Sequence, residues 1–212
     1  RRAPTPAADA VVRMTLELPP GEHLYVFGGG GAGIIAISPL GDRIAYVAQD
    51  TAGAHTYVRR TGELTGRAVA YNAGDLVFSP DGRWLAYSVG AEIRKVSSDG
   101  GAVVSIVTDS RLIVRGLAWL RSDTIVIGGF GGLRTVPAAG GTVRVLAGSD
   151  TTQNQAYPVL LPDGRTLAFA NGQPGARKLA LLAPGQARYT QLDVPALAPI
   201  GMAEGQLMFV AA

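Results

Sequence analysis

A unit of about ten residues recurs along the chain at a fixed spacing. It is clearest from Phe78 to Tyr87, which reads Phe-Ser-Pro-Asp-Gly-Arg-Trp-Leu-Ala-Tyr. Near copies run from Ile37 to Tyr46 and from Leu160 to Phe169, and two degenerate copies run from Ala118 to Ile127 and from Gly201 to Phe209. With Ser79 as the marker, the copies lie at 38, 79, 119, 161 and 202, in steps of 41, 40, 42 and 41 residues. A fixed period of this length indicates stacked supersecondary units.

Each unit predicts a β-hairpin. An apolar strand leads into Ser79, whose hydroxyl can accept a bond from nearby backbone N–H groups. Pro80 fixes φ for a type I turn, Asp81 can bond its own backbone, and Gly82 suits the left-handed position. The first copy departs from this pattern because Leu40 stands where Asp81 stands in the second. A returning strand after the turn completes the hairpin.

The second repeat contains four short strands. We predict them at Leu76 to Ser79, Trp84 to Val89, Glu92 to Val96 and Val103 to Val107. No stretch shows the 3.6-residue periodicity of a helix. Four strands in ~40 to 45 residues are typical of a propeller blade. The sequence therefore predicts an all-β fold, a β-propeller of about five four-stranded blades or part of a larger ring.

The two ends of the chain bear on how such a ring closes. Residues 1–10 are rich in Pro and Ala and predict an extended linker, whereas residues 11–212 predict a single propeller domain. The last repeat supplies only two strands, and an unpaired sheet edge is an aggregation template. Val12 to Leu18, which alternates apolar and polar residues, is our candidate to complete that blade beside Gln206 to Val210, with Leu24 to Phe27 as a second piece. The alternative is an excised part of a larger ring that other residues or another chain complete.

The composition argues against nucleic-acid partners, membrane spans and cysteine-based sites. The net charge is +3 and the pI is 9.4, but the basic residues are spread singly along the chain. Because nucleic-acid binding needs clustered basic residues, we predict no nucleic-acid partner. The chain has no run of ~18 apolar residues, so we predict no membrane span within it. It contains no Cys, which excludes disulfides and thiolate metal sites.

Motifs for catalysis and for cofactors are missing or lack their context. No Gly-x-Ser-x-Gly elbow occurs, and His23 and His55 have no partner at metal-ligand spacing. Residues 28–33 match Gly-x-Gly-x-x-Gly literally, but a strand follows them, where a dinucleotide site needs a helix. We therefore predict no catalytic residues, no metal and no cofactor.

The Ser-Pro-Asp-Gly-Arg-x-Leu-Ala-Tyr repeats resemble the TolB-type class of β-propeller. More narrowly, the segments 12–21 and 35–39 and the turn Asp99-Gly100-Gly101 resemble the extracytoplasmic propellers of bacterial membrane-bound serine/threonine protein kinases. This resemblance implies a periplasmic domain, associated with a membrane through a partner or an upstream segment. It does not imply an activity, because propellers host enzymes, sensors and scaffolds alike.

Three functions are compatible with these features. The first is a non-catalytic sensor or protein-interaction domain, the second an accessory subunit of a membrane protein complex, and the third a hydrolase or lyase that uses the propeller channel. In a propeller the loops between blades, and those between second and third strands, gather at one rim, opposite the Pro-Asp-Gly turns. These rim loops supply the candidate binding residues Asp50, Tyr71, Asn72, Asp75, Arg111, Gln153, Asn154 and Tyr157.

Overall fold

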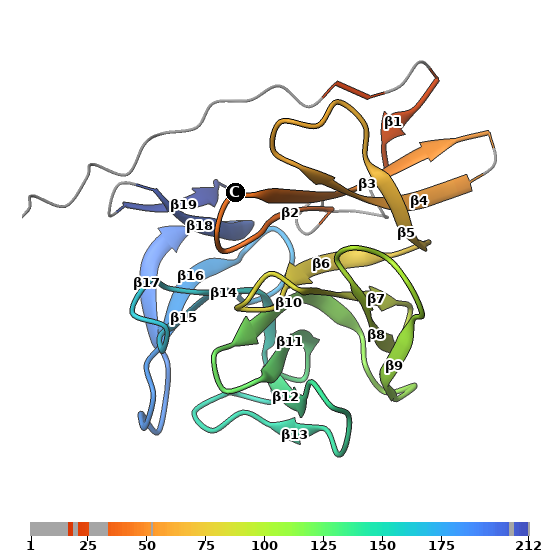
Figure 1. Cartoon of the computed structure of the whole chain (residues 1–212). Coiled ribbons are helices and arrows are strands. Elements are labelled where there is room, and N and C mark those ends of the chain that lie inside the picture. The colour runs from red at the N-terminus through yellow and green to blue at the C-terminus, as the bar shows by residue number, and fades with distance from the viewer. Residues whose placement is uncertain (1–16, 19–20, 26–33, 52, 204–205, 212) are drawn as a thin grey trace, which may run out of the picture.

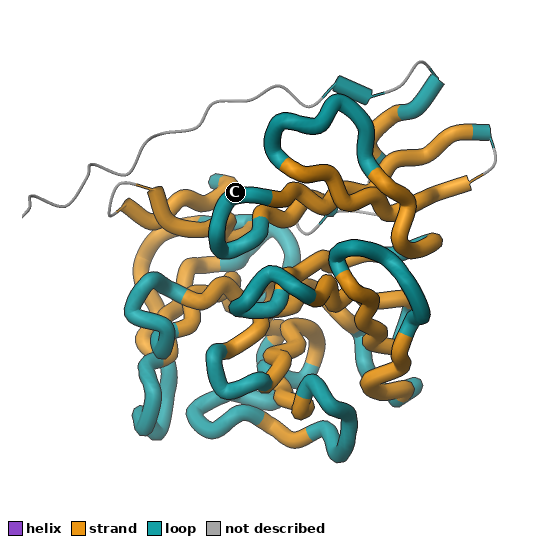
Figure 2. Tube along the Cα trace, viewed as in Figure 1, coloured by secondary structure: helices purple, strands orange, loops and turns teal. Residues whose placement is uncertain are grey.

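The computed structural model of the chain describes residues 17–18, 21–25, 34–51, 53–203 and 206–211. This part of the chain is built of nineteen β-strands joined by turns and loops, and it contains no helix (Figure 2). The all-β class predicted from the sequence is therefore confirmed.

The strands follow the repeats. The first repeat holds β2 (Ile35–Ile37), β3 (Arg43–Asp50), β4 (Gly53–Arg60) and β5 (Arg67–Tyr71), preceded by β1 (His23–Leu24). The second holds β6 (Gly74–Phe78), β7 (Trp84–Val89), β8 (Glu92–Ser97) and β9 (Val104–Thr108). The third holds β10 (Val114–Leu120), β11 (Thr124–Phe130), β12 (Arg134–Pro137) and β13 (Arg144–Val145). The fourth holds β14 (Asn154–Leu160), β15 (Leu167–Asn171), β16 (Lys178–Leu182) and β17 (Thr190–Pro195), and the last holds β18 (Ala198–Ala203) and β19 (Gln206–Val210).

Within each repeat, neighbouring strands pair in antiparallel fashion. Figure 1 shows the resulting sheets placed one after another around a centre, from β1–β5 at the upper right to β18 and β19 at the upper left. The first strand of each repeat contacts the first strand of the next, from β2 through β6, β10 and β14 to β18. This is propeller architecture, with the first strands innermost. The number of blades in a complete ring stays a prediction.

The hydrophobic core is divided among the faces between successive sheets. Tyr87, Leu85 and Val47 belong to the cluster between the first and second repeats, and Ile93, Ile125 and Trp119 to the next one. Phe169 anchors the cluster between the third and fourth repeats. These side chains are 0 to 5% exposed. Each face depends on apolar residues from two repeats, so a single repeat could not bury its own strands.

The predicted turn chemistry is present in the repeats. The Ser79 hydroxyl donates to Asp81 Oδ1 (2.6 Å) and accepts from the Trp84 N–H (2.9 Å). Gly82, at the last position of the turn, has φ +70°, a left-handed conformation that glycine adopts readily. The first repeat has Leu40 in place of the turn Asp, yet the Ser38 hydroxyl donates to Asp42 Oδ1 (2.6 Å). A carboxylate two residues further along thus replaces the missing one.

Replacing Asp42 by alanine is expected to lower the free energy of unfolding by about 0.5 to 1.5 kcal/mol, since the turn carboxylate and its hydrogen bond to Ser38 are lost. Urea unfolding of Asp42→Ala measures the loss. Leu40→Ala is the control, because the Leu40 side chain is 79% exposed. If both variants lose the same stability, Asp42 does not substitute for the turn Asp.

The prediction for the N-terminal segment was wrong where the structure describes it. His23 and Leu24 of β1 pair with Gln49 and Ala48 of β3, in the first repeat, and not with the last blade. β1 and β2 lie along the same edge of β3, so together they form the innermost strand of the first blade. Leu18 packs on Ile44 and Tyr46 of β3. The proposed pairing of residues 12–16 with β19, and the glycine motif at 28–33, lie outside the described residues.

The innermost strands share an irregularity that the sequence analysis did not predict. A register shift interrupts the pairing of β6 between Gly74 and Val77, of β10 between Val114 and Leu117, and of β14 between Ala156 and Val159. Asp75, Gly116 and Tyr157 occupy these β-bulges with φ of +47°, +99° and +56°. Bulges redirect side chains and recur near functional sites. The bulges thus place residues with positive φ in three successive inner strands.

Candidate functional site

The strand order places every predicted binding residue toward one end of the sheets. The connections that follow the last strand of each repeat, and those between second and third strands, meet at this end, which we call the loop rim. Asp50 pairs with Gly53 at the β3–β4 hairpin there. The Pro-Asp-Gly turns and the connections between third and fourth strands lie at the other end, which we call the turn end. The structure thus agrees with the assumed topology, while a binding role for the rim is a separate question.

The loop rim carries several exposed apolar side chains. Tyr71 is 67% exposed, and its ring lies 4.9 Å from the ring of His55, centroid to centroid. Asn72, next in the chain, has φ +50° and donates its N–H to the Ala54 carbonyl (3.0 Å). Ile113 and Phe130, on the following connections, are 51% and 41% exposed. The rim therefore offers an aromatic and aliphatic surface of the kind found in protein interfaces.

Asp75 lies deeper, between the second and third repeats. Its carboxylate accepts from the Ser88 hydroxyl (2.9 Å) and from the Gly116 backbone N–H. Burial raises the pKa of Asp75 above its ordinary value, and the two hydrogen bonds and the charge of Arg115 oppose that rise. Asp75 therefore joins two inner strands, and its carboxylate is committed to that contact.

Gly116 and Tyr157 come into close backbone contact between the third and fourth repeats. A Cβ on Gly116 would lie 2.6 Å from Tyr157 Cα and 2.9 Å from Tyr157 N. Only glycine allows this approach, and φ +99° at Gly116 is also a conformation that glycine favours. Tyr157 itself holds φ +56°, a costly value for a residue with a large side chain.

The ring of Tyr157 lies against Arg177, a residue that the sequence analysis did not single out. The Arg177 guanidinium carbon is 5.4 Å from the ring centroid, a cation–π contact. In the amide orientation that satisfies both of its groups, Asn154 donates to the Gly129 carbonyl (3.3 Å) and accepts from Arg177 Nη2 (3.2 Å). Asn154 is 1% exposed, so it supports Arg177 from inside the rim.

Gln155 was also missed, because an isolated glutamine in a strand reads as a surface residue. It is fully buried. Its Oε1 accepts from the Ser149 hydroxyl (2.6 Å) and the Leu133 N–H (3.2 Å), and its Nε2 donates to Asn171 Oδ1 (3.3 Å). Gln155 also pairs with Gly129 across β11 and β14, which joins the third and fourth repeats into one sheet.

The two remaining candidates stay apart from this group. Arg111 donates to both oxygens of Asp109 (2.8 Å each), and its side chain is 86% exposed. These bonds lower the pKa of Asp109 to about 2. Gln153 is half-buried on the loop before β14. The structure therefore gathers Asn154 and Tyr157 around Arg177, whereas it leaves Arg111 and Gln153 on the outer part of the rim.

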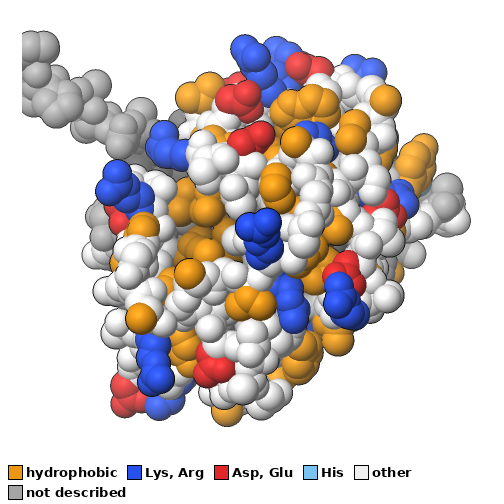
Figure 3. Space-filling model, turned by 90° about the horizontal axis from the view of Figure 1, so that it is seen from below, with side chains coloured by type: hydrophobic (Ala, Val, Ile, Leu, Met, Phe, Trp, Pro, Cys, Tyr) orange, Lys and Arg blue, Asp and Glu red, His pale blue; other side chains and the backbone are white. Residues whose placement is uncertain are grey.

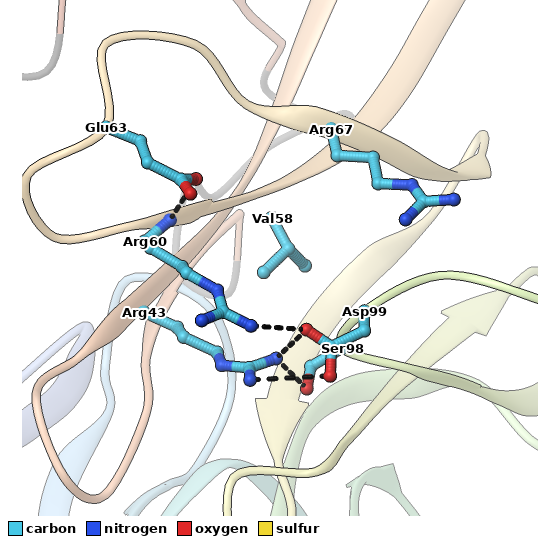
Figure 4. Close-up of a pocket in the computed structure, with 7 residues that line it drawn as sticks. All are labelled: Arg43, Val58, Arg60, Glu63, Arg67, Ser98 and Asp99. Atoms are coloured by element: carbon cyan, nitrogen blue, oxygen red, sulfur yellow. Dashed lines mark hydrogen bonds and ion pairs between the residues drawn. The ribbon is translucent and has the colours of Figure 1, made fainter.

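A pocket of about 280 Å³ lies at the turn end, between the first and second repeats. Arg43, Arg60 and Arg67 line it, and Figure 4 shows Arg43 and Arg60 converging on Ser98 and Asp99. Asp99 accepts from Arg43 Nη1 (2.9 Å) and from Arg60 Nη2 (3.0 Å), and Arg43 also donates to Ser98. Arg43 and Arg60 belong to the first sheet and Asp99 to the second. The pairs therefore link neighbouring sheets, and we assign this pocket a structural role.

The pocket makes stability depend on pH. Hydrogen bonds from Arg60 and Arg43 lower the pKa of Asp99 below its ordinary value. A depressed folded-state pKa gives stability that is present above the unfolded pKa and is lost as the pH falls through the folded pKa. We expect Asp99→Asn to be less stable than the parent at about pH 7, and the difference to vanish in acid. Thermal melts across this range test it, and a difference independent of pH would contradict the linkage.

The described residues offer neither a candidate metal site nor a membrane-spanning helix. On the side of the molecule seen in Figure 3, Lys and Arg side chains are scattered among acidic, neutral and apolar ones. In the described part of the chain no three His, Cys, Asp or Glu side chains are grouped so as to hold a metal ion. The same residues include no helix long and apolar enough to cross a membrane.

Comparison with known proteins identifies the fold. The chain matches no protein-family model and no curated protein.

Among solved structures it is similar to TolB from Acinetobacter baumannii, with TM-score 0.64 and 20% identity over 78% of this chain and 44% of that one. A structure described as TolB from Agrobacterium tumefaciens gives TM-score 0.64 and 18% identity over 76% of this chain and 66% of that one. An oligogalacturonate lyase in complex with manganese gives TM-score 0.57 and 14% identity over 81% and 56%. The chain thus spans about half to two thirds of the TolB chains, and its fold is that of a TolB-like propeller.

Proposed function

We propose that this propeller is a non-catalytic recognition domain that works outside the cytoplasm and binds a protein partner through its loop rim. The observation that carries the proposal is the series of exposed apolar side chains on successive rim connections, with Tyr71 the most exposed of them at 67%. Aromatic residues on a polar surface are the usual anchors of protein interfaces. The rim also rests on buried polar contacts, which hold its loops in fixed positions.

The location and the parent protein belong to the proposal too. The likeness to TolB structures supports a periplasmic domain. Association with a membrane, through a partner or an upstream segment, is a further part of the proposal. An accessory subunit of a membrane complex would use the same rim. The two alternatives differ in what the reading frame encodes before Arg1. A reading frame that encodes a kinase region and a spanning helix before Arg1 would support the sensor, and one that lacks both would support the accessory subunit.

Site-specific photocrosslinking in the host cell tests the rim. A photoreactive amino acid is placed at Tyr71, Ile113 or Gln153, and for comparison at Leu40 or Leu64 of the turn end, which are 79% and 89% exposed. We expect a protein adduct of one defined mass from the rim positions, reduced by a Phe130→Ala change in the same chain. Adducts from the turn end alone would show that the partner binds the other face.

A further inference from the structure

Arg177 lacks the counter-charge that a buried arginine normally has. The residue is 8% exposed, and none of the ion pairs between described residues includes it. Its Nε is buried without a hydrogen-bond partner. Removing a charge from water without pairing it is costly, so native proteins rarely leave a buried arginine in this state.

The contacts that Arg177 does make fix its position without neutralising it. Asn154 Oδ1 accepts from Nη2 (3.2 Å), and the Tyr157 ring lies under the guanidinium. Both partners are uncharged. Nη1 has no hydrogen-bond partner among the described residues and is not enclosed as Nε is. The guanidinium edge formed by Nη1 and Nη2 is therefore held in a fixed direction and keeps unused N–H donors. This geometry suits the two oxygens of a carboxylate.

The position of Arg177 places this edge at the loop rim. Arg177 follows the exposed residues 173–176, on the connection between the second and third strands of the fourth repeat. It lies beside Tyr157, which has a left-handed backbone conformation and closely approaches Gly116. Strained residues of this kind persist where the surrounding structure enforces them, commonly at ligand sites.

We propose that Arg177 is a subsite for a carboxylate, which a bound protein supplies from an acidic side chain or from its chain end. This inference rests on the proposed function, because the ligand is part of a partner at the rim. Asn154 and Tyr157 are positioning residues for the guanidinium. The carboxylate completes the ion pair that the chain itself lacks, so partner binding removes the cost of the unpaired charge.

Nuclear magnetic resonance of the arginine Nε–Hε groups tests the subsite in the wild-type chain, which avoids any question of a variant's folding. The probes are N-acetylglycine for a chain end and N-acetylaspartate amide for a side chain, with N-acetylglycinamide as the neutral control. We expect a saturable shift of the Arg177 signal with one or both carboxylates, with Kd on the order of 1 mM. The relative affinities of the two carboxylates identify the source.

Arg111 provides the matched control. It lies on the same rim but is already paired with Asp109, so its signal should not respond beyond a general salt effect. Arg177→Gln should abolish probe binding and Arg111→Gln should leave it unchanged. Equal shifts with the neutral amide, equal response of Arg111, or unchanged binding to Arg177→Gln would overturn the subsite. Rim crosslinks that persist while the probes fail to bind would reject the subsite alone, whereas probe binding without rim crosslinks would reject the proposed function.

Discussion

Gly116→Ala is expected to lower the free energy of unfolding by about 3 kcal/mol or more, the largest single effect we predict for a change of one methyl group. The added Cβ would lie 2.6 Å from Tyr157 Cα and 2.9 Å from Tyr157 N, which are backbone atoms of β14. Relief would require β10 and β14 to separate. In addition, φ +99° at this position is unfavourable for alanine. Urea unfolding of the purified variant measures the loss.

Gly74→Ala is the matched control for this prediction. Gly74 stands next to the bulge of β6, and Gly116 lies in the bulge of β10. A Cβ on Gly74 would meet only Ser88 Oγ, at 3.4 Å. We expect its stability within about 1 kcal/mol of the parent. If the two variants lose similar stability, the close approach of the third and fourth repeats does not hold in solution.

Gln155→Leu is expected to cost about 2 to 4 kcal/mol, although leucine has a similar volume and is more apolar. The change removes the acceptor for the Ser149 hydroxyl and the donor to Asn171 Oδ1. Asn171, which is buried, would then lose a donor that solvent cannot readily replace, and the half-buried Ser149 hydroxyl would need a new acceptor. Because β11 and β14 pair at this residue, the loss should also loosen the joined sheet. Urea unfolding and hydrogen exchange of the Leu133 amide measure these two effects.

Gln153→Leu controls for the same substitution two residues earlier. The Gln153 amide makes only a 3.5 Å contact with Thr152 Oγ1, and its backbone bond to Asp150 would remain. We expect its stability to change by no more than about 0.5 kcal/mol. A Gln155→Leu variant as stable as Gln153→Leu would mean that the buried network adds nothing to the fold.

The strands and turns could be predicted because their signals are local. Ser79, Pro80 and Gly82 each favour one turn conformation through their own stereochemistry. The alternating apolar residues that follow then set the faces of the returning strand. Even the degenerate third repeat kept its strands, because Ile125 is buried at the position of Leu85 in the second repeat.

The remainder depends on contacts between repeats, which a local pattern does not encode. Leu24 was expected in the last blade but pairs with β3, because the free edge of β3 beside β2 is apparent only in three dimensions. Asp42 could replace the missing turn Asp because its carboxylate reaches the same hydroxyl from two residues away. Asp75 and Tyr157 were expected at the rim as loop residues, but bulges place them in the inner strands.

Arg177 and Gln155 show why polar site residues are hard to find in one sequence. An isolated arginine or glutamine in a β-rich chain is usually a solvated surface residue. The signal that distinguishes them is burial together with the identity of their partners, and both follow from how the third and fourth repeats approach each other. Gly128 marks that approach, since a Cβ on it would lie 2.6 Å from Pro158 Cδ in the fourth repeat.

The central claim, that the loop rim is the recognition surface, is tested most directly by the affinity of the crosslinked partner once it has been purified. Isothermal titration calorimetry compares the parent chain with Tyr71→Ala at the rim and Leu64→Ala at the turn end, two exposed positions where alanine should leave the fold intact. If the rim is the interface, Tyr71→Ala weakens binding about tenfold or more, which corresponds to ~1.4 kcal/mol, and Leu64→Ala leaves the affinity unchanged. Loss of affinity in Leu64→Ala, with Tyr71→Ala binding as the parent does, would contradict the account and place the interface at the turn end.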